Sequence, residues 1–207
     1  MKYIQGFYQN TIIIQKSKFI AEAYRVNSIE EIEDILLKVR KKYYDATHHC
    51  YAYRIHQSLQ KCSDDGEPSK TAGAPILDVI TKQNLENILI VVTRYFGGIL
   101  LGAGGLVRAY SQAASLSLKE AQFFKVEERI QFQLTCSYSE YQTIVKVFRY
   151  IQIEKTSFLS EVVILGSCRK EDYSKLENDL FQYKLKDARI TNLGYALTEV
   201  PLDDTLI

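Results

Sequence analysis

The segment VVTRYFGGILLGAGGLVRAYSQAA, residues 91–114, has the residue types of an anion-binding site. Five of the chain's ten glycines fall within nine positions of it, namely Gly97, Gly98, Gly102, Gly104 and Gly105. A glycine-rich turn between a β-branched strand and a helix N-terminus presents unpaired backbone N–H groups and the positive end of the helix dipole to one point. Arg94 precedes the glycines and Arg108 follows them. The sequence therefore predicts a site for phosphate or another anion.

The known nucleotide-binding signatures are absent from this segment. No Gly-Lys-Ser or Gly-Lys-Thr occurs, and GAGGLV places Val107 where the dinucleotide fingerprint has Gly or Ala. This excludes a P-loop nucleotide hydrolase. The glycines have a second explanation, in which they let a tight loop and a helix pack closely on a sheet. The sequence leaves both explanations open.

Two polar stretches, THHC and SDDGE, contain atoms that could bind a ligand or a metal. Their candidate residues are His48, His49, Cys50, Asp64, Asp65 and Glu67. Adjacent residues of a strand point to opposite faces, so His48 and His49 do not readily share one ion. Asp and Gly are also ordinary turn residues. We expect no metal, and we keep the histidines, the three carboxylates and Lys70 as candidate ligand-binding residues.

Nucleophilic catalysis is a weaker possibility. Cys50 lies next to a histidine, and candidate hydroxyls occur at Ser63, Ser69, Thr71 and Thr93. The sequence has no GxSxG motif and no recognisable triad spacing. A cysteine in a buried strand is more often a small apolar side chain than a nucleophile. We therefore expect no catalytic residue and no cofactor.

The elements that position these residues can be predicted from periodicity and capping. Ser28 and Glu31 have the capping-box spacing and should open a helix that closes in KVRKK. Residues 88–94, ILIVVTR, are apolar on both faces, which is typical of a buried central strand. The remaining predictions for the first part of the chain are a hairpin of strands 8–15 and 17–26 with its turn at Lys16 and Ser17, a strand at 47–55, a short helix from Pro75, and a helix over 105–121.

From about residue 130 the pattern starts again. A strand in FQLTCSY, a helix over 139–151, two strands, a helix and a last strand give the order β-α-β-β-α-β. This is the ferredoxin-like pattern. Charge replaces apolar periodicity in KVEER, residues 125–129, so we predict two domains, 1–127 and 128–207.

Composition places few limits on function. Residues 1–125 carry 16 Lys and Arg against 12 Asp and Glu, and residues 126–207 carry 10 against 13, so the first part is net +4 and the second net −3. An anionic partner is permitted by the first value but not required. The four cysteines form no close pair, the N-terminus has no signal-peptide pattern, and no stretch has the length of a membrane span. We expect a cytoplasmic protein.

Three long motifs identify a family. They are DATHHCYAYRI, SDDGEPSKTAGAPIL and VVTRYFGGILLGAGGLVRAYSQA, and together with the opening KSKFIA they resemble the IMPACT family, or UPF0029 domain, over residues 16–121. Residues 130–200 are similar to the small C-terminal domain of bacterial members. Lys70 stands where the family often has glycine, which matters if that position needs a positive φ.

The resemblance implies an α+β chain of two domains. The first would be like domain 2 of ribosomal protein S5, and the second a ferredoxin-like βαββαβ sandwich. Eukaryotic relatives with an added recognition domain act on the translational stress response through protein partners. The bacterial branch supplies no established catalytic residues to carry over.

Three functional hypotheses follow. The leading one is a non-catalytic protein of translation regulation that binds RNA, the ribosome or a translation factor through the first domain, with no membrane partner and no specificity for a DNA sequence. The second is an enzyme acting on a small phosphorylated or peptide-like substrate, with the histidines and carboxylates grouped around the glycines. The third is a protein-interaction module that offers the sheet of the second domain.

Overall fold

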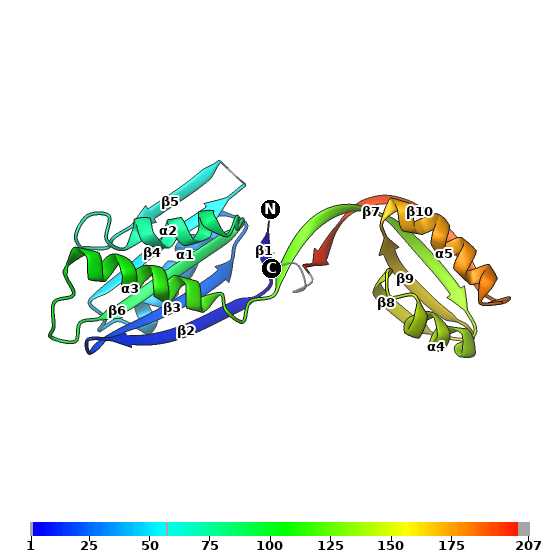
Figure 1. Cartoon of the computed structure of the whole chain (residues 1–207), viewed down its shortest axis with the longest axis horizontal. Coiled ribbons are helices and arrows are strands. Elements are labelled where there is room, and N and C mark those ends of the chain that lie inside the picture. The colour runs from blue at the N-terminus through cyan, green and yellow to red at the C-terminus, as the bar shows by residue number, and fades with distance from the viewer. Residues whose placement is uncertain (1, 57, 203–207) are drawn as a thin grey trace. The chain divides into compact units, whose positions relative to one another are not determined.

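The computed structural model, described here for residues 2–56 and 58–202, contains two compact units (Figure 1). The first comprises the chain up to Lys125 together with Pro201 and Leu202, and the second comprises Val126–Val200. Each unit has its own sheet, helices and apolar core. This confirms the predicted α+β fold of two domains, while the predicted boundary at residues 127 and 128 stays a prediction.

The sheet of the first unit is antiparallel and has five strands in the order β2-β3-β6-β4-β5. Their bounds are Phe7–Ile14, Ser17–Arg25, Ile88–Tyr95, His48–Ile55 and Leu59–Ser63. β6 is the central strand, and it is buried from Ile88 to Arg94. Its even-numbered apolar residues enter one core and its odd-numbered ones enter another, as expected for a strand with both faces covered.

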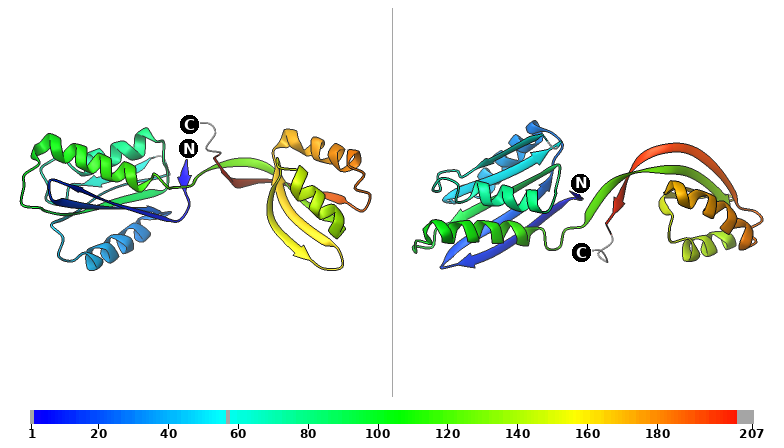
Figure 2. Two further views of the ribbon diagram at one scale, coloured as in Figure 1. Left: turned by 60° about the horizontal axis from the view of Figure 1, so that its bottom comes forward. Right: turned by 45° about the horizontal axis from the view of Figure 1, so that its top comes forward.

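Helices cover both faces of this sheet. α1 (Ile29–Lys42) lies on the face opposite α2 (Gly73–Lys82) and α3 (Gly102–Ser117), as the left view of Figure 2 shows. β4 divides its side chains accordingly. Cys50 and Ala52 pack in the core beneath α2 and α3, whereas Tyr53 and Ile55 pack with Ile32 and Val39 of α1.

The start of α1 follows the predicted cap. The Ser28 hydroxyl accepts a hydrogen bond from Glu31 N at 3.2 Å, and the Glu31 carboxylate accepts one from Asn27 N at 2.8 Å. The second bond reaches one residue further back than in a standard capping box. The three basic residues of the last turn face the negative end of the helix dipole.

Several element boundaries differ from the prediction. The turn of the β2–β3 hairpin is Gln15-Lys16, one residue earlier than predicted, and both residues have positive φ. β5 was not predicted, because its five residues show no apolar alternation. α3 begins at Gly102 rather than 105 and ends at Ser117. Its early start places Gly102, Gly104 and Gly105 within the helix rather than in the loop before it.

The second unit has the predicted order β-α-β-β-α-β. Its elements are β7 (Phe123–Cys136), α4 (Tyr138–Val147), β8 (Gln152–Phe158), β9 (Val162–Cys168), α5 (Lys170–Gln182) and β10 (Arg189–Pro201). β9 lies between β7 and β8, and β10 pairs with the other edge of β7. That strand arrangement is ferredoxin-like. One core of buried side chains from β7, β9, α4 and α5 holds the unit together.

The connection between the units is a strand rather than a loop. KVEER lies inside β7. The first two residues of β7, Phe123 and Phe124, belong to the first unit and pair there with β1 (Tyr3–Ile4). Among residues 2–56 and 58–202, each helix is too short or too polar to cross a lipid bilayer.

Candidate functional site

Arg94 is a buried side chain in this structure. It is 5% exposed, and its Nη1 lies 2.6 Å from Oε1 of Glu67, which is itself 8% exposed. Its Nη2 donates to the Ser17 hydroxyl at 3.3 Å, while Phe19 and Phe96 flank the guanidinium. From the sequence, Arg94 was expected to supply charge to a bound phosphate or other anion. The structure instead uses its charge to hold Glu67 in the interior.

Tyr110 of α3 completes this buried cluster. Its hydroxyl donates to Oε1 of Glu67 at 2.7 Å and lies 3.3 Å from Sγ of Cys50. Burial, the largest effect, raises the pKa of the Cys50 thiol to about 12, and it also raises the pKa of Tyr110. Cys50 is therefore protonated at neutral pH and is a poor nucleophile.

The loop before α2 is organised by Asp64. Its Oδ1 accepts hydrogen bonds from Ala72 N and Gly73 N at 3.0 and 2.8 Å, and its Oδ2 accepts one from Lys70 N at 2.8 Å. Burial works to raise the pKa of Asp64, but these three backbone donors outweigh it and hold the pKa below its usual range. Asp64 thus caps α2 from a distance in sequence, because Ala72 at the N-cap has no side-chain acceptor.

The two histidines and Asp65 form a second group of contacts. Asp65 Oδ2 accepts from His49 N at 2.6 Å, and Asp65 Oδ1 pairs with Arg40 at 3.1 Å. His48 Nδ1 is 2.7 Å from the carbonyl oxygen of Asp65, and its Nε2 is 4.0 Å from Glu67. His49 Nε2 is 3.1 Å from the carbonyl oxygen of Tyr43. The histidines therefore have different surroundings, as strand alternation predicted.

These groups meet around Glu67, but they are engaged with one another. His48, Cys50, Arg94 and Tyr110 all lie within contact distance of Glu67 or of its partners. In the part of the chain that the structure describes, no three His, Cys, Asp or Glu side chains are grouped as metal ligands. The cluster ties β4, β6, α3 and the loop before α2 together.

Gly97 and Gly98 serve the loop between β6 and α3 in different ways. A Cβ on Gly97 would overlap backbone atoms of Lys16 and Ser17, so Gly97 lets the β2–β3 turn approach the loop. Gly97 N also donates to the Ser17 hydroxyl at 3.1 Å. Gly98 has φ +81°, a conformation that favours glycine. Close packing therefore explains Gly97, and the positive φ of the loop explains Gly98.

Among the glycines inside α3, Gly104 has neither a close neighbour nor a positive φ that would require glycine. Gly102 at the first position has φ +69°. A Cβ on Gly104 would meet only Arg108 Nη1 at 3.9 Å, and Gly104 is exposed with no positive φ. Nothing within this unit requires glycine there, although glycine in a helix costs about 0.5–1 kcal/mol relative to alanine. Leu101 at the N-cap provides no side-chain acceptor for the first N–H groups of α3, which an α-helix leaves without intrahelical partners.

An uncharged surface surrounds these glycines. Residues 96–107 contain no charged or polar side chain, yet Leu100 is 85% exposed and Phe96 is 46% exposed. The exposed charged side chains beside this stretch are three basic ones and Asp45, whose Oδ1 accepts a hydrogen bond from the Tyr95 hydroxyl at 2.9 Å. Lys16 belongs to the turn that packs on Gly97, Lys18 pairs with Tyr95 in register, and Arg108 follows on α3. We call residues 96–108 with Lys16, Lys18 and Lys70 the glycine surface.

Three segments contribute to this surface. The β2–β3 turn, the loop from β6 to α3 and the loop before α2 lie at the same end of the first unit in both figures (Figures 1 and 2). Lys70, in the last of these loops, is exposed and has φ +62°. This is the left-handed conformation that favours glycine, so a lysine at this position has some backbone strain.

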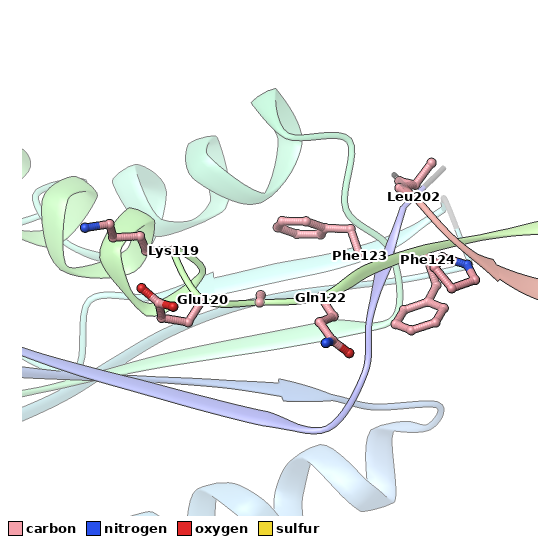
Figure 3. Close-up of a pocket in the computed structure, with 8 residues that line it drawn as sticks. Lys119, Glu120, Gln122, Phe123, Phe124 and Leu202 are labelled. Atoms are coloured by element: carbon pink, nitrogen blue, oxygen red, sulfur yellow. The ribbon is translucent and has the colours of Figure 1, made fainter. Parts of the chain in front are cut away.

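A pocket of about 500 Å³ lies elsewhere, beyond the C-terminal end of α3 (Figure 3). Its lining comes from the first unit only and comprises Lys119, Glu120, Ala121, Gln122, Phe123, Phe124, Pro201 and Leu202. It contains none of the candidate residues. Tyr110 and Ser17, which contact the buried cluster, were not among the candidate functional residues predicted from the sequence. The available signal was an arginine near the end of a buried, mostly apolar strand, because a buried guanidinium needs hydrogen-bonding partners.

Asp64 gives a pH-dependent prediction. Its folded-state pKa is lowered, so its stabilising effect is present above the unfolded carboxyl pKa of about 3.9 and is lost as the pH falls through the folded value. Asp64→Asn keeps one acceptor but cannot accept from Lys70 N and both helix donors. We expect it to lose about 0.5–2 kcal/mol at pH 7, the range of a lost helix cap, and less below pH 4.

Urea unfolding of both proteins between pH 3 and pH 7 measures this difference. Asp78→Asn, an exposed carboxylate on α2 that pairs only with Lys82, is the control and should change stability by less than about 0.5 kcal/mol. A difference for Asp64→Asn that stays constant across the range would mean that the cap does not depend on the carboxylate charge.

The fold and this site define a two-domain α+β protein. Its first domain has the glycine surface, which includes exposed basic side chains, and a buried cluster of Arg94, Glu67 and Tyr110. The Impact N-terminal domain model matches residues 15–118. Similar proteins include the IMPACT family member YvyE of Bacillus subtilis, which is 42% identical over 167 residues, 80% of this chain and 75% of YvyE. The chain belongs to the IMPACT family.

Further relatives agree with this assignment. YigZ of Escherichia coli, another IMPACT family member, is 36% identical over 61% of this chain and 64% of its own length. A crystal structure described only as a hypothetical protein is 26% identical, covers 91% of this chain and 95% of its own, and has a TM-score of 0.57. The two-domain translational regulator Yih1 is 30% identical over 56% of this chain and 48% of its own, with a TM-score of 0.40, which is too low to support an inference about the fold.

Proposed function

We propose that this chain is a non-catalytic, cytoplasmic protein of translation regulation that binds RNA of the translation machinery through the glycine surface. The observation that carries the proposal is Gly104, an exposed helical glycine at which an added Cβ would meet only the end of the Arg108 side chain. A ligand that approaches the backbone closely would explain why residue 104 is a glycine.

The chemistry of the surface suits a phosphate backbone. The uncapped N–H groups at the start of α3 can donate to phosphate oxygens, and the helix dipole favours negative charge there. Lys16, Lys70 and Arg108 add mobile positive charges. Phe96 is exposed beside them and offers a face on which a base can stack. No carboxylate lies within residues 96–108, and Asp45 beside them is bound to the Tyr95 hydroxyl.

Arg94 has an indirect role in this proposal. Its guanidinium is held by Glu67, so it orders the loop that carries the glycines instead of touching RNA. The same engagement argues against the enzyme hypothesis. Cys50 is protonated, Asp64 is committed to the backbone of the loop before α2, and Glu67 is paired, so none of the three is a free acid, base or nucleophile.

The link to translation comes from the family. Its eukaryotic members are expected to act on the translational stress response, and we extend that process to this chain without extending their protein partners. RNA is preferred to a protein factor here because backbone N–H groups and lysines recognise phosphates directly.

The test is RNA binding measured by fluorescence anisotropy as a function of salt, with ribosomal RNA fragments as probes. The variant Lys16→Gln, Lys70→Gln, Arg108→Gln removes the three positive charges and keeps polar side chains at these positions. We expect an affinity at least 10-fold lower and a salt slope smaller by about 2 to 3, since each lost phosphate contact lowers the slope by about 0.7–0.9.

A matched control removes the same charge elsewhere. Lys61, Lys82 and Lys119 are exposed lysines outside the glycine surface, and their triple Gln variant should bind within about 2-fold of the unmodified protein after correction for net charge. Equal losses in the two variants would show that binding follows net charge alone. Unchanged affinity in the first variant would remove the glycine surface from the proposal.

A further inference from the structure

β2 is a free edge of the first unit's sheet. Within the part of the chain that the structure describes, it pairs only with β3, and the register runs through all eight residue pairs from Phe7–Tyr24 to Ile14–Ser17 without a bulge. Its sequence, FYQNTIII, contains no charge and no proline. Edge strands are usually protected by one of these features, because their open backbone groups can pair with another chain. This edge has none of the three.

The backbone groups of alternate residues face away from β3. Gln15 and Lys16, with φ +43° and +66°, form a two-residue turn, which is closed by a hydrogen-bonded pair of its flanking residues, here Ile14 and Ser17. At the other end, the carbonyl of Gly6 accepts from Arg25 N at 3.4 Å. Even-numbered residues therefore bond to β3. By alternation, the N–H and C=O groups of the odd-numbered residues point outward.

The side chains of β2 also alternate. Tyr8, Ile12 and Ile14 pack toward the core beneath α2 and α3. The odd-numbered side chains lie on the other face, and the two large apolar ones are exposed, Phe7 by 49% and Ile13 by 72%. These two residues are placed symmetrically about Asn10. The open edge thus has the same pattern when it is followed in either direction.

We propose that β2 is a homodimerisation edge, at which the β2 strands of two copies pair antiparallel about a two-fold axis at Asn10. In this register Phe7 lies opposite Ile13 of the second copy, and Gln9 lies opposite Thr11 of the second copy. Every directly opposed odd-numbered pair consists of two residues whose backbone groups face outward, as a hydrogen-bonded pair requires.

Neighbouring registers fit less well. A shift of one residue places odd-numbered residues opposite even-numbered ones, whose backbone groups already bond to β3. A shift of two brings Phe7 opposite Thr11 or removes it from the pairing, so an exposed apolar side chain loses its apolar partner. The pattern specifies a second copy better than an unrelated partner, because the strand is uncharged and matches itself. This inference is independent of RNA binding.

Sedimentation of the full chain over about 1–300 μM tests the proposal. We expect the unmodified protein to form dimers within this range. Thr11→Pro removes an outward N–H that β3 does not use, and edge strands accept proline at such positions. This variant should remain folded by circular dichroism and stay monomeric, with an apparent dimer dissociation constant raised at least 10-fold. Thr11→Val, which keeps the N–H and the branched shape, should dimerise like the unmodified protein.

A disulfide test fixes the register and does not depend on proline being tolerated. In the proposed pairing the two Asn10 residues form a non-hydrogen-bonded pair with Cα atoms about 4.5 Å apart, a separation that a disulfide can span. In a Cys62→Ser background, which removes the exposed thiol, Asn10→Cys should give a covalent dimer under mild oxidation. Thr11 lies opposite Gln9 of the second copy in this register, so the two Thr11 residues are not directly opposed. Thr11→Cys should therefore give much less covalent dimer.

The sedimentation and disulfide experiments have results that support the β2 dimer and results that overturn it. A dimer that Thr11→Pro abolishes and Asn10→Cys traps supports the proposal. A protein that is monomeric at 300 μM and is not trapped by Asn10→Cys overturns it. A dimer that Thr11→Pro leaves intact, or that Thr11→Cys traps as well as Asn10→Cys does, overturns the proposed edge or its register.

Discussion

Gly97→Ala should destabilise the first unit by about 3 kcal/mol, at the upper end of the range for overpacked sites. The added methyl group would overlap the backbone of Lys16 and Ser17. Backbone atoms of a tight turn cannot rotate away as a side chain can, so the loop or the β2–β3 hairpin must shift. Such a shift also breaks the bond from Gly97 N to the Ser17 hydroxyl, and that hydroxyl in turn accepts from Arg94.

Gly104→Ala is the matched control for this substitution. Its methyl group meets only the mobile end of Arg108, and alanine is the better helix former, so we expect about 0.5–1 kcal/mol of added stability. If Gly104 is bare for a ligand, the same variant should bind RNA more weakly although it is more stable. Stability and binding would then change in opposite directions at one residue.

Hydrogen exchange of peptides from β3 and β6 in increasing urea measures these effects on the first unit alone. Loss of protection at lower urea in Gly97→Ala, together with a gain in Gly104→Ala, is the expected result. Equal stability of Gly97→Ala and the unmodified protein would mean that the turn and the loop separate at little cost.

Glu67→Ala should destabilise the first unit by about 3–5 kcal/mol, the usual penalty for leaving a buried charge without its partner. The Arg94 guanidinium would keep its charge in the interior with one hydroxyl contact, at Ser17. The Tyr110 hydroxyl would lose the acceptor that it donates to at 2.7 Å. Because Arg94 precedes the glycines directly, we also expect faster exchange in the loop that follows it.

Two further variants separate charge from packing. Arg94→Met with Glu67→Leu replaces the pair by apolar side chains and should recover most of the stability that Glu67→Ala loses, since buried pairs are often no better than apolar groups of similar volume. Lys82→Ala breaks an exposed pair and should change stability by less than about 0.5 kcal/mol. A small effect of Glu67→Ala would show that water reaches Arg94 in solution.

Much of the framework could be predicted from local patterns. Ser28 as a cap, β6 as a strand buried on both faces, the opposite surroundings of His48 and His49, and the β-α-β-β-α-β order of the second unit all follow from periodicity and capping. These properties depend on neighbours a few residues away in the chain, so the sequence displays them directly. The family could also be identified, because three long motifs occur together.

The misplaced boundaries depend on contacts between elements that are distant in the chain. The start of α3 was predicted three residues too late because an uncapped helix start with several glycines resembles a loop in sequence. The helix is stabilised by the packing of Leu106, Ala109 and Tyr110 on the sheet, which local sequence does not show. β5 was missed because an exposed edge strand needs no apolar alternation. Its conformation is set by its bonds to β4.

The sequence by itself determined which residues are capable of chemistry, and the tertiary structure decided which of them are free to act. Arg94 and Arg108 look alike in sequence, yet one is held by Glu67 in the interior and the other lies exposed on α3. Asp64 and Glu67 are neighbours in one loop, yet one caps α2 and the other neutralises an arginine from β6. The reason is physical: the availability of a charged group depends on burial and on partners up to 77 residues away in the chain, and local sequence does not encode such distances.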